Sequence, residues 1–146
     1  MSAIVETHLR TLTKTVLYRV LAIISVMLIT LAFGGTGAQA GAMGLWVLIG
    51  GTLIYYIHDR VWLLFGWKQE QGDDKIARSI VKTVIYRIII MIIAFIAAKI
   101  VVTDSNSTAA AFTAAQMIVN LLLYYIIERV FNRISWGKVP AASEEL

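Results

Sequence analysis

The stretch RTLTKTVLYR, residues 10–19, returns as RSIVKTVIYR at residues 78–87. A second matching pair lies further along: LIYYIHDRVW at residues 53–62 and LLYYIIERVF at residues 122–131. The first pair is offset by 68 residues and the second by 69. The one-residue difference falls in a predicted turn, where insertions are tolerated. The sequence therefore predicts two tandem copies of one unit, each with a basic entrance and a tyrosine-rich exit.

Each unit contains two long apolar segments. Only 15% of the 146 residues are charged and 59% are hydrophobic, whereas a soluble domain has about 25% charged residues. No Asp, Glu, Lys or Arg lies between Arg19 and Asp59, and none lies from Ser105 to Ile127. Both stretches are longer than the ~20 apolar residues that cross a bilayer as a helix. The predicted fold is all-α, an integral membrane four-helix bundle built from two tandem helical hairpins.

The expected spans are residues 16–33, 45–65, 81–102 and 109–131. They divide the chain into a first membrane hairpin (1–67), a cytoplasmic connector (68–77), and a second membrane hairpin with a short polar tail (78–146). The uncharged, glycine-rich segment GGTGAQAGAMG, residues 34–44, is expected to form the whole turn of the first hairpin. Because each hairpin crosses the membrane twice, both copies face the same way, about an axis along the membrane normal.

The basic residues are strongly asymmetric along this topology. Twelve of the thirteen Lys and Arg residues lie on the side of the termini and the connector, and only Lys99 lies near the other side. The positive-inside rule therefore predicts that both termini are cytoplasmic. The residues expected to anchor this interface are basic and aromatic: Lys14, Tyr18, Trp62, Trp67, Lys82, Tyr86 and Trp136.

Two charge pairs are predicted inside the hairpins. Arg19 and Asp59 are expected at similar depths on antiparallel neighbours when counted from Gly34 and Gly44 at ~1.5 Å per residue. Arg87 and Glu128 repeat the arrangement with a looser match. Arg60 and Arg129 would complete the network, since a guanidinium group binds carboxylates in a two-pronged way. Plain interfacial anchoring and a ligand or ion site are the two alternatives for these residues.

A polar stripe runs along the fourth span, where Gln116, Asn120, Tyr124 and Glu128 recur every four residues. The first copy has Val47 and Gly51 in place of the two amides, so half of the stripe exists once. Interhelical hydrogen bonding is the favoured interpretation, and a polar pathway is the alternative.

The sequence offers few residues for catalysis. It has no cysteine, and its two histidines, His8 and His58, form no metal-binding spacing. No glycine-rich phosphate loop is present next to a nucleotide-binding pattern. We expect a protein that is not an enzyme and that has no cofactor and no metal site.

The repeated motifs resemble an uncharacterised prokaryotic membrane family, domain of unknown function 2061, in two tandem copies. Its members carry a Lys–aromatic–Arg entrance and a Tyr–Tyr–x–His–Glu–Arg–x–Trp exit. In this sequence the first copy supplies Lys14, Tyr18, Arg19, Tyr55, Tyr56, His58, Asp59, Arg60 and Trp62, and the second supplies Lys82, Tyr86, Arg87, Tyr124, Tyr125, Glu128, Arg129 and Phe131. Asp59, Ile127 and Phe131 depart from the pattern. The resemblance implies the plasma membrane of a prokaryote and brings no known activity.

The expected function is that of an accessory or scaffolding subunit of a larger membrane complex. Its partners would be membrane lipid and other membrane subunits, with no nucleic acid. A membrane metalloenzyme, such as a monooxygenase of the ammonia or methane type, is one example of such a complex, and no motif supports it. A small oligomeric transporter or channel is the alternative.

Overall fold

The computed structural model of the protein describes residues 4–64 and 73–140. Four of its helical segments are long and apolar enough to cross a membrane, which confirms the predicted spans: His8–Ala32, Gly37–Trp62, Ile80–Val101 and Asn106–Arg133. The helices that carry them are α1 (His8–Ala32), α2 (Gly37–Leu45), the π-helical turn η1 (Trp46–Gly50), α3 (Gly51–Leu64), α4 (Asp73–Val101) and α5 (Asn106–Arg133).

The turn of the first hairpin is shorter than the sequence predicts. Helix α2 begins at Gly37, because Thr36 caps it. The Gln39 amide donates to Thr36 Oγ1 at 3.2 Å, and the Thr36 amide donates to Gln39 Oε1 at 2.8 Å. This reciprocal capping box supports a helix in spite of its glycines. Gly34, with φ of +83°, makes the turn itself. The expectation of a turn over all of 34–44 is therefore wrong.

One turn of the second span is π-helical. It covers Trp46–Gly50 and joins α2 to α3 without a break in the chain direction. The Trp46 ring covers Gly50, and a Cβ atom at Gly50 would lie only 3.1 Å from that ring. Glycine is therefore suited to this position, and π-helical turns of this kind often occur at functional sites.

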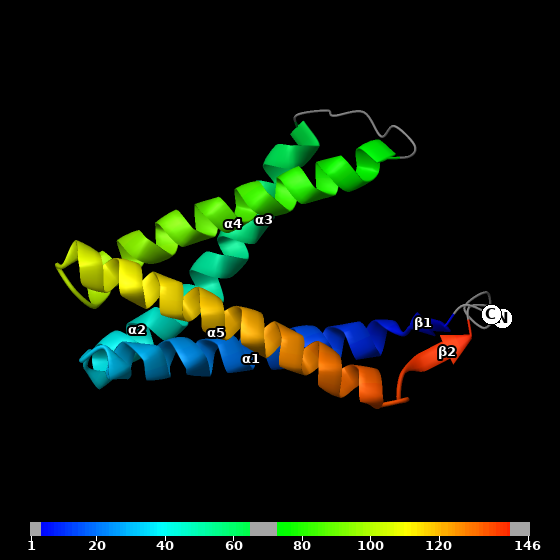
Figure 1. Ribbon diagram of the computed structural model, residues 1–146, viewed down its shortest axis with the longest axis horizontal. Coiled ribbons are helices and arrows are strands. Elements are labelled where there is room, and N and C mark those ends of the chain that lie inside the picture. Colours follow the sequence, from blue (N-terminus) through cyan, green and yellow to red (C-terminus); the bar gives the residue numbers. More distant parts are fainter. Residues whose placement is uncertain (1–3, 65–72, 141–146) are drawn as a thin grey trace.

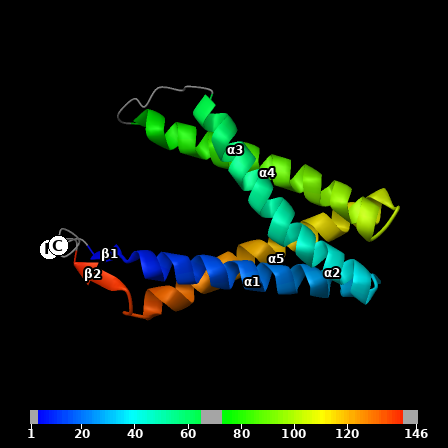
Figure 2. The ribbon, with the colours of Figure 1, turned by 180° about the vertical axis from the view of Figure 1, so that it is seen from behind.

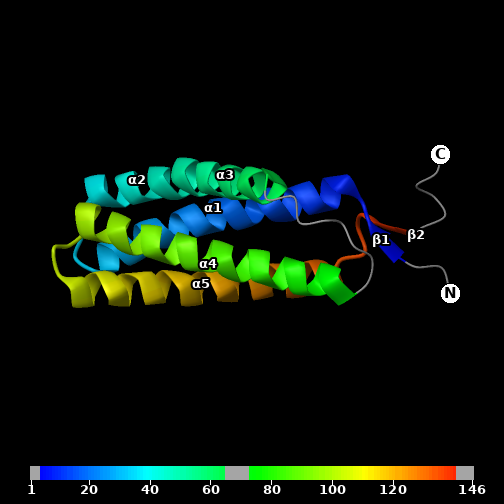
Figure 3. The same ribbon diagram turned by 90° about the horizontal axis from the view of Figure 1, so that it is seen from above.

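The four spans are arranged as two arms. Helices α1 and α5 pack together as one arm, and α3 and α4 form the other (Figures 1 and 2). The arms meet at the end of the molecule where the hairpins turn, and they diverge toward the end where the chain termini lie (Figure 1). Seen from above, all four spans run along one long axis (Figure 3). Each arm therefore combines one helix from each repeat.

The apolar core lies at the hairpin turns. It consists of Val26, Met43, Ala97, Ala98, Ala109 and Phe112, all buried. Phe33 meets Phe112 edge-on with ring centroids 5.5 Å apart. A Cβ atom at Gly44 would lie 3.2 Å from Met27, so the small residue permits close approach of α1 and α2. This core holds the closed end of the two arms together.

Two short strands join the ends of the described chain. Strand β1 (Ile4–Glu6) pairs antiparallel with β2 (Lys138–Pro140), with Val5 opposite Val139. Strands of three residues are too short to show an alternating pattern in the sequence. They bring the start of α1 next to the end of α5, where the first group of functional candidates lies.

Candidate functional site

A ladder of three contacts holds α1 against α5, and Arg10 makes the first of them. Its side chain is fully buried, with 0% exposure. Nη1 donates to the carbonyl oxygens of Ile134, at 3.0 Å, and Trp136, and Nη2 donates to that of Phe131. The guanidinium carbon also lies 5.5 Å from the centre of the Phe131 ring. Arg10 thus supplies hydrogen bonds to carbonyl groups at the end of α5 and in the turn that follows it.

The second contact is an ion pair between Lys14 and Glu128. Lys14 Nζ lies 3.3 Å from both carboxylate oxygens, and the two side chains are 13% and 34% exposed. Glu128 thus pairs across the repeats with Lys14 on α1. The predicted pair of Arg87 and Glu128 within the second hairpin is not formed, because α5 presents Glu128 to Lys14 on α1, while Arg87 on α4 is an exposed residue at the edge of a separate cavity.

The third contact is aromatic and occurs in both arms. Tyr18 meets Tyr124 edge-on at 6.4 Å between ring centroids. Tyr86 meets Tyr55 in the same way at 5.8 Å. Tyr18 corresponds to Tyr86 in the repeat, and Tyr124 corresponds to Tyr55. The equivalence shows that the two copies are related by a pseudo-twofold rotation, with contacts exchanged between copies.

The depth match predicted for Arg19 and Asp59 does not hold. Helix α2 starts at Gly37, so Asp59 lies twenty-two residues into the second span, whereas Arg19 lies thirteen residues from the end of α1 at Ala32. At ~1.5 Å per residue, this places the Asp59 backbone about 13 Å nearer the end with the termini. The side chain of Asp59 lies outside the described residues. The residue at the level of Arg19 is Gly51, where a Cβ atom would be 3.3 Å from Arg19 Nη1.

Arg60 and Arg129 contact tyrosines on their own helices. The Arg60 guanidinium lies 5.2 Å from the centre of the Tyr56 ring. Arg129 Nε donates to the Tyr125 hydroxyl at 3.0 Å. In the part of the chain described, Arg129 does not join Glu128 in a charged network, because residues four positions apart share a face of a helix and adjacent residues do not.

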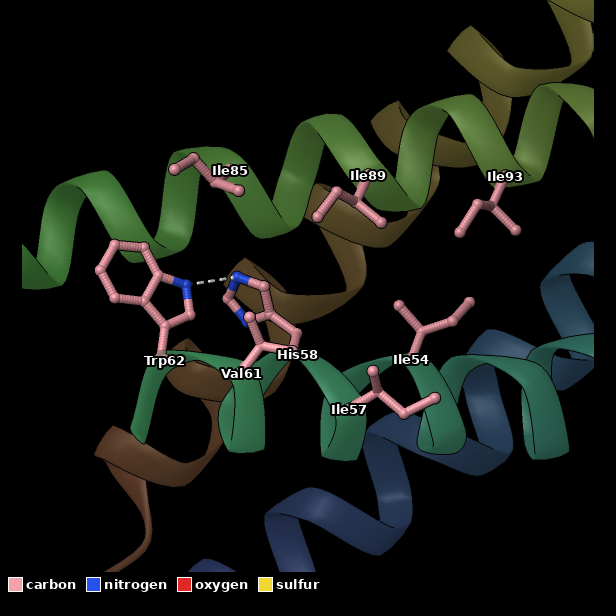
Figure 4. A pocket seen from close by; sticks show the side chains of 8 residues that line it. All are labelled: Ile54, Ile57, His58, Val61, Trp62, Ile85, Ile89 and Ile93. Atoms are coloured by element: carbon pink, nitrogen blue, oxygen red, sulfur yellow. Dashed lines mark hydrogen bonds between the residues drawn. The ribbon is translucent and has the colours of Figure 1, made fainter. Parts of the chain in front are cut away.

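His58 of the second span lies in a groove between α3 and α4. Trp62 Nε1 donates to His58 Nε2 at 2.8 Å, and the His58 ring lies 5.4 Å from Tyr86 (Figure 4). The other side chains around this groove are apolar: Ile54, Ile57, Val61, Ile85, Ile89 and Ile93. The groove has a volume of about 680 Å³. At the equivalent place in the other arm, Ile127 is buried.

A second cavity, of about 480 Å³, lies between all four spans. Arg19 of α1 and Arg87 of α4, which correspond to one another in the repeat, both line it. Gln116 and Asn120 of α5 line it as well. Within residues 4–64 and 73–140, neither arginine makes a hydrogen bond or an ion pair. The structure thus places at one cavity two arginines that were predicted to belong to separate charge pairs.

The four residues of the polar stripe on α5 lie in two environments: Gln116 and Asn120 line the cavity, and Tyr124 and Glu128 contact α1. Gln116 is 7% exposed, and its Nε2 donates to Asn120 Oδ1 at 3.3 Å, while its Oε1 has no hydrogen-bond partner. The hydrogen bond expected between helices is formed within α5. Val47 and Gly51, which replace the amides in the first copy, line the same cavity.

The predicted interface anchors have different environments. Lys14, Tyr18, Trp62 and Tyr86 contact side chains of the protein, as described above, rather than standing free on the surface. Lys82 is partly buried. Trp136 is exposed and offers only its carbonyl group to Arg10. Trp67 lies outside the described residues.

Sequence reasoning missed the role of Arg10 and the pairing of α1 with α5. A usable signal was present in the spacing. Arg10, Lys14 and Tyr18 lie four residues apart on one face of α1. Tyr124, Glu128 and Phe131 form a matching row on α5, so two antiparallel rows of complementary chemistry were available to be paired.

The comparison with known proteins agrees with this duplicated architecture. The chain matches no curated protein and no solved structure. Residues 12–63 and 80–132 each match the family described as "Predicted membrane protein (DUF2061)". The two matches cover the two hairpins and most of the chain. The chain therefore belongs to this family of predicted membrane proteins and carries two tandem copies of its domain.

Proposed function

We propose that the protein is a non-catalytic subunit that associates with another membrane protein through its exposed helix faces. The observation that supports this is the low burial of the spans. In the most apolar stretch of each span, only 11–22% of the residues are buried by the rest of the chain. Most of the surface of each span is therefore available to lipid or to further helices.

The α3–α4 arm offers the surface best suited to such a partner. The groove of about 680 Å³ between α3 and α4 is lined mainly by isoleucine side chains. A second apolar groove of about 480 Å³ lies between the α2–η1–α3 span and α4, near the hairpin turns. Helices associate in membranes chiefly by close packing of such surfaces, so a transmembrane helix of a partner is the occupant that we propose.

The proposed location is the plasma membrane of a prokaryote, with both termini in the cytoplasm. The charge asymmetry supports this orientation, since twelve of thirteen Lys and Arg residues lie toward the side of the termini. The proposed partners are lipids and membrane subunits, and none of the sequence motifs points to nucleic acid.

Purification from native membranes tests this proposal. The tagged chain, extracted in mild detergent, should carry a second membrane protein in fixed stoichiometry, identified by mass spectrometry. Ile89→Trp should fill the groove between α3 and α4 and release that partner. Ile118→Trp is the matched control, because Ile118 is an exposed residue of α5 that lines neither groove. Recovery of the wild-type chain alone as a homo-oligomer would argue against the proposal.

A small oligomeric transporter is the second candidate, and the cavity that holds Arg19 and Arg87 is the observation that favours it. Flux of anions into vesicles that contain only this protein, abolished by Arg87→Gln, would support a transporter. Vesicles without flux above empty ones would support the accessory role.

A further inference from the structure

We propose that the cavity between the four spans binds an oxyanion through Arg19 and Arg87. The proposal concerns a site in the chain itself and does not depend on whether a partner subunit is present. Arg19 and Arg87 hold equivalent positions in the two repeats, so the pseudo-twofold relation brings two guanidinium groups to one cavity.

The depth of the two arginines makes a bound anion favourable. Arg19 lies thirteen residues before the end of α1 at Ala32, and Arg87 lies fourteen before the end of α4 at Val101. At ~1.5 Å per residue, both are about 20 Å from the hairpin turns, within a hydrocarbon layer of about 30 Å. A cation at this depth is costly without a counter-charge.

Three other basic residues of α1 and α5 show the contrast, whereas Arg133 is exposed at the end of α5. Arg10 reaches three carbonyl oxygens, Lys14 reaches Glu128, and Arg129 reaches Tyr125. Arg19 and Arg87 have no such partner in the described part of the chain. Two like charges that line one cavity also repel each other, and an anion between them removes this repulsion.

The remaining lining supplies further polar groups. Gln116 is 7% exposed, and its Nε2 uses one of its two N–H groups on Asn120 Oδ1, so the second N–H can donate to an oxyanion in the cavity. Its Oε1, which has no hydrogen-bond partner and can only accept, can take a hydrogen bond from an arginine. Tyr86, next to Arg87 in the chain, also lines this cavity. Planar guanidinium groups bind phosphate-type oxyanions with paired hydrogen bonds.

The size and surroundings of the cavity indicate the class of ligand. A volume of about 480 Å³ holds a phosphate-sized group with water and is far larger than a halide needs. Ile54 and Ile93 line both this cavity and the apolar groove of Figure 4. A phosphate group can therefore reach the arginines as a free anion or as the headgroup of a lipid whose chains occupy the groove.

Binding to the purified full chain tests the proposal. In maltoside micelles, which carry no phosphate group, inorganic phosphate is titrated at constant ionic strength, with radiolabelled phosphate for binding and thermal unfolding for stabilisation. In a second arm without inorganic phosphate, the micelles contain increasing phosphatidylglycerol. We expect one arm to saturate at about one ligand per chain. Saturation with phosphate identifies a free anion, and saturation only with phosphatidylglycerol identifies a headgroup.

The variants separate the site from general charge effects. Arg19→Gln and Arg87→Gln should each weaken binding about tenfold or more, as loss of charged hydrogen bonds predicts. Arg19→Lys should lie between them and wild type. Arg133→Gln, which removes an exposed charge at the end of α5, should change affinity by less than about twofold. Because neither arginine has a hydrogen-bond or ion-pair partner within residues 4–64 and 73–140, the unfolding temperature of the Gln variants without ligand should not fall. Lack of saturation in both arms, or equal weakening by Arg133→Gln, would overturn the proposal.

Discussion

Replacing Arg10 with alanine should destabilise the protein more than replacing any exposed arginine. The change removes a fully buried side chain and three hydrogen bonds to the carbonyl groups of Phe131, Ile134 and Trp136. A hydrogen bond to a charged group contributes about 1.5–3 kcal/mol. Water at this end of the molecule can replace part of the loss, so we expect a fall of about 2–4 kcal/mol in the free energy of unfolding.

The assay is reversible unfolding in mixed micelles, followed by far-UV circular dichroism. Arg10→Lys should recover only part of the loss, because one ammonium group cannot match the fork that reaches three carbonyl oxygens. Arg133→Ala is the control and should cost less than about 0.5 kcal/mol. Hydrogen exchange should increase locally at Ile134 and Lys138, the amide donors at the end of α5 and the following turn. A loss for Arg10→Ala no larger than for Arg133→Ala would show that the cap contributes little.

Two further predictions follow from the pairing of the helices and from the charge asymmetry. A double-mutant cycle on Lys14→Met and Glu128→Gln should give a coupling of about 0.5–1.5 kcal/mol in unfolding free energy. A cycle on Arg87→Met and Glu128→Gln should give a coupling of about zero. A larger coupling for Arg87 than for Lys14 would instead support the pair within the second hairpin. In intact cells, a cysteine in place of Asp104 should react with an impermeant thiol reagent and one in place of Ser135 should not, and the opposite labelling would invert the proposed orientation.

The sequence was sufficient to predict the spans and the duplication, because both depend on patterns along the chain. Long uncharged stretches and a repeated motif need no knowledge of neighbours in space. The family and the four-helix membrane fold followed from the same patterns and are confirmed. The limits of the first turn were wrong, since a single capping box at Thr36 made a helix from a glycine-rich segment.

The partners of the helices could not be read in the same way. In a membrane the surface that faces lipid is as apolar as the surface that faces another helix, so hydropathy does not distinguish them. Pairing within each hairpin was the simplest assumption, and it assigned Glu128 to Arg87. The structure instead pairs Glu128 with Lys14, 114 residues away along the chain. Arg19 and Arg87 also line one cavity, and no pattern in the sequence predicts that cavity.

The exchange of helices between the two repeats has a consequence for biosynthesis. The ladder partners of α1 described above lie on α5, and the contact of Arg10 with Ile134 spans 124 residues. When the first hairpin enters the bilayer, neither arm can yet be completed. Lys14 cannot meet Glu128 until α5 has been synthesised, 114 residues later. Insertion can therefore proceed hairpin by hairpin, while assembly of the two arms follows insertion of the second hairpin.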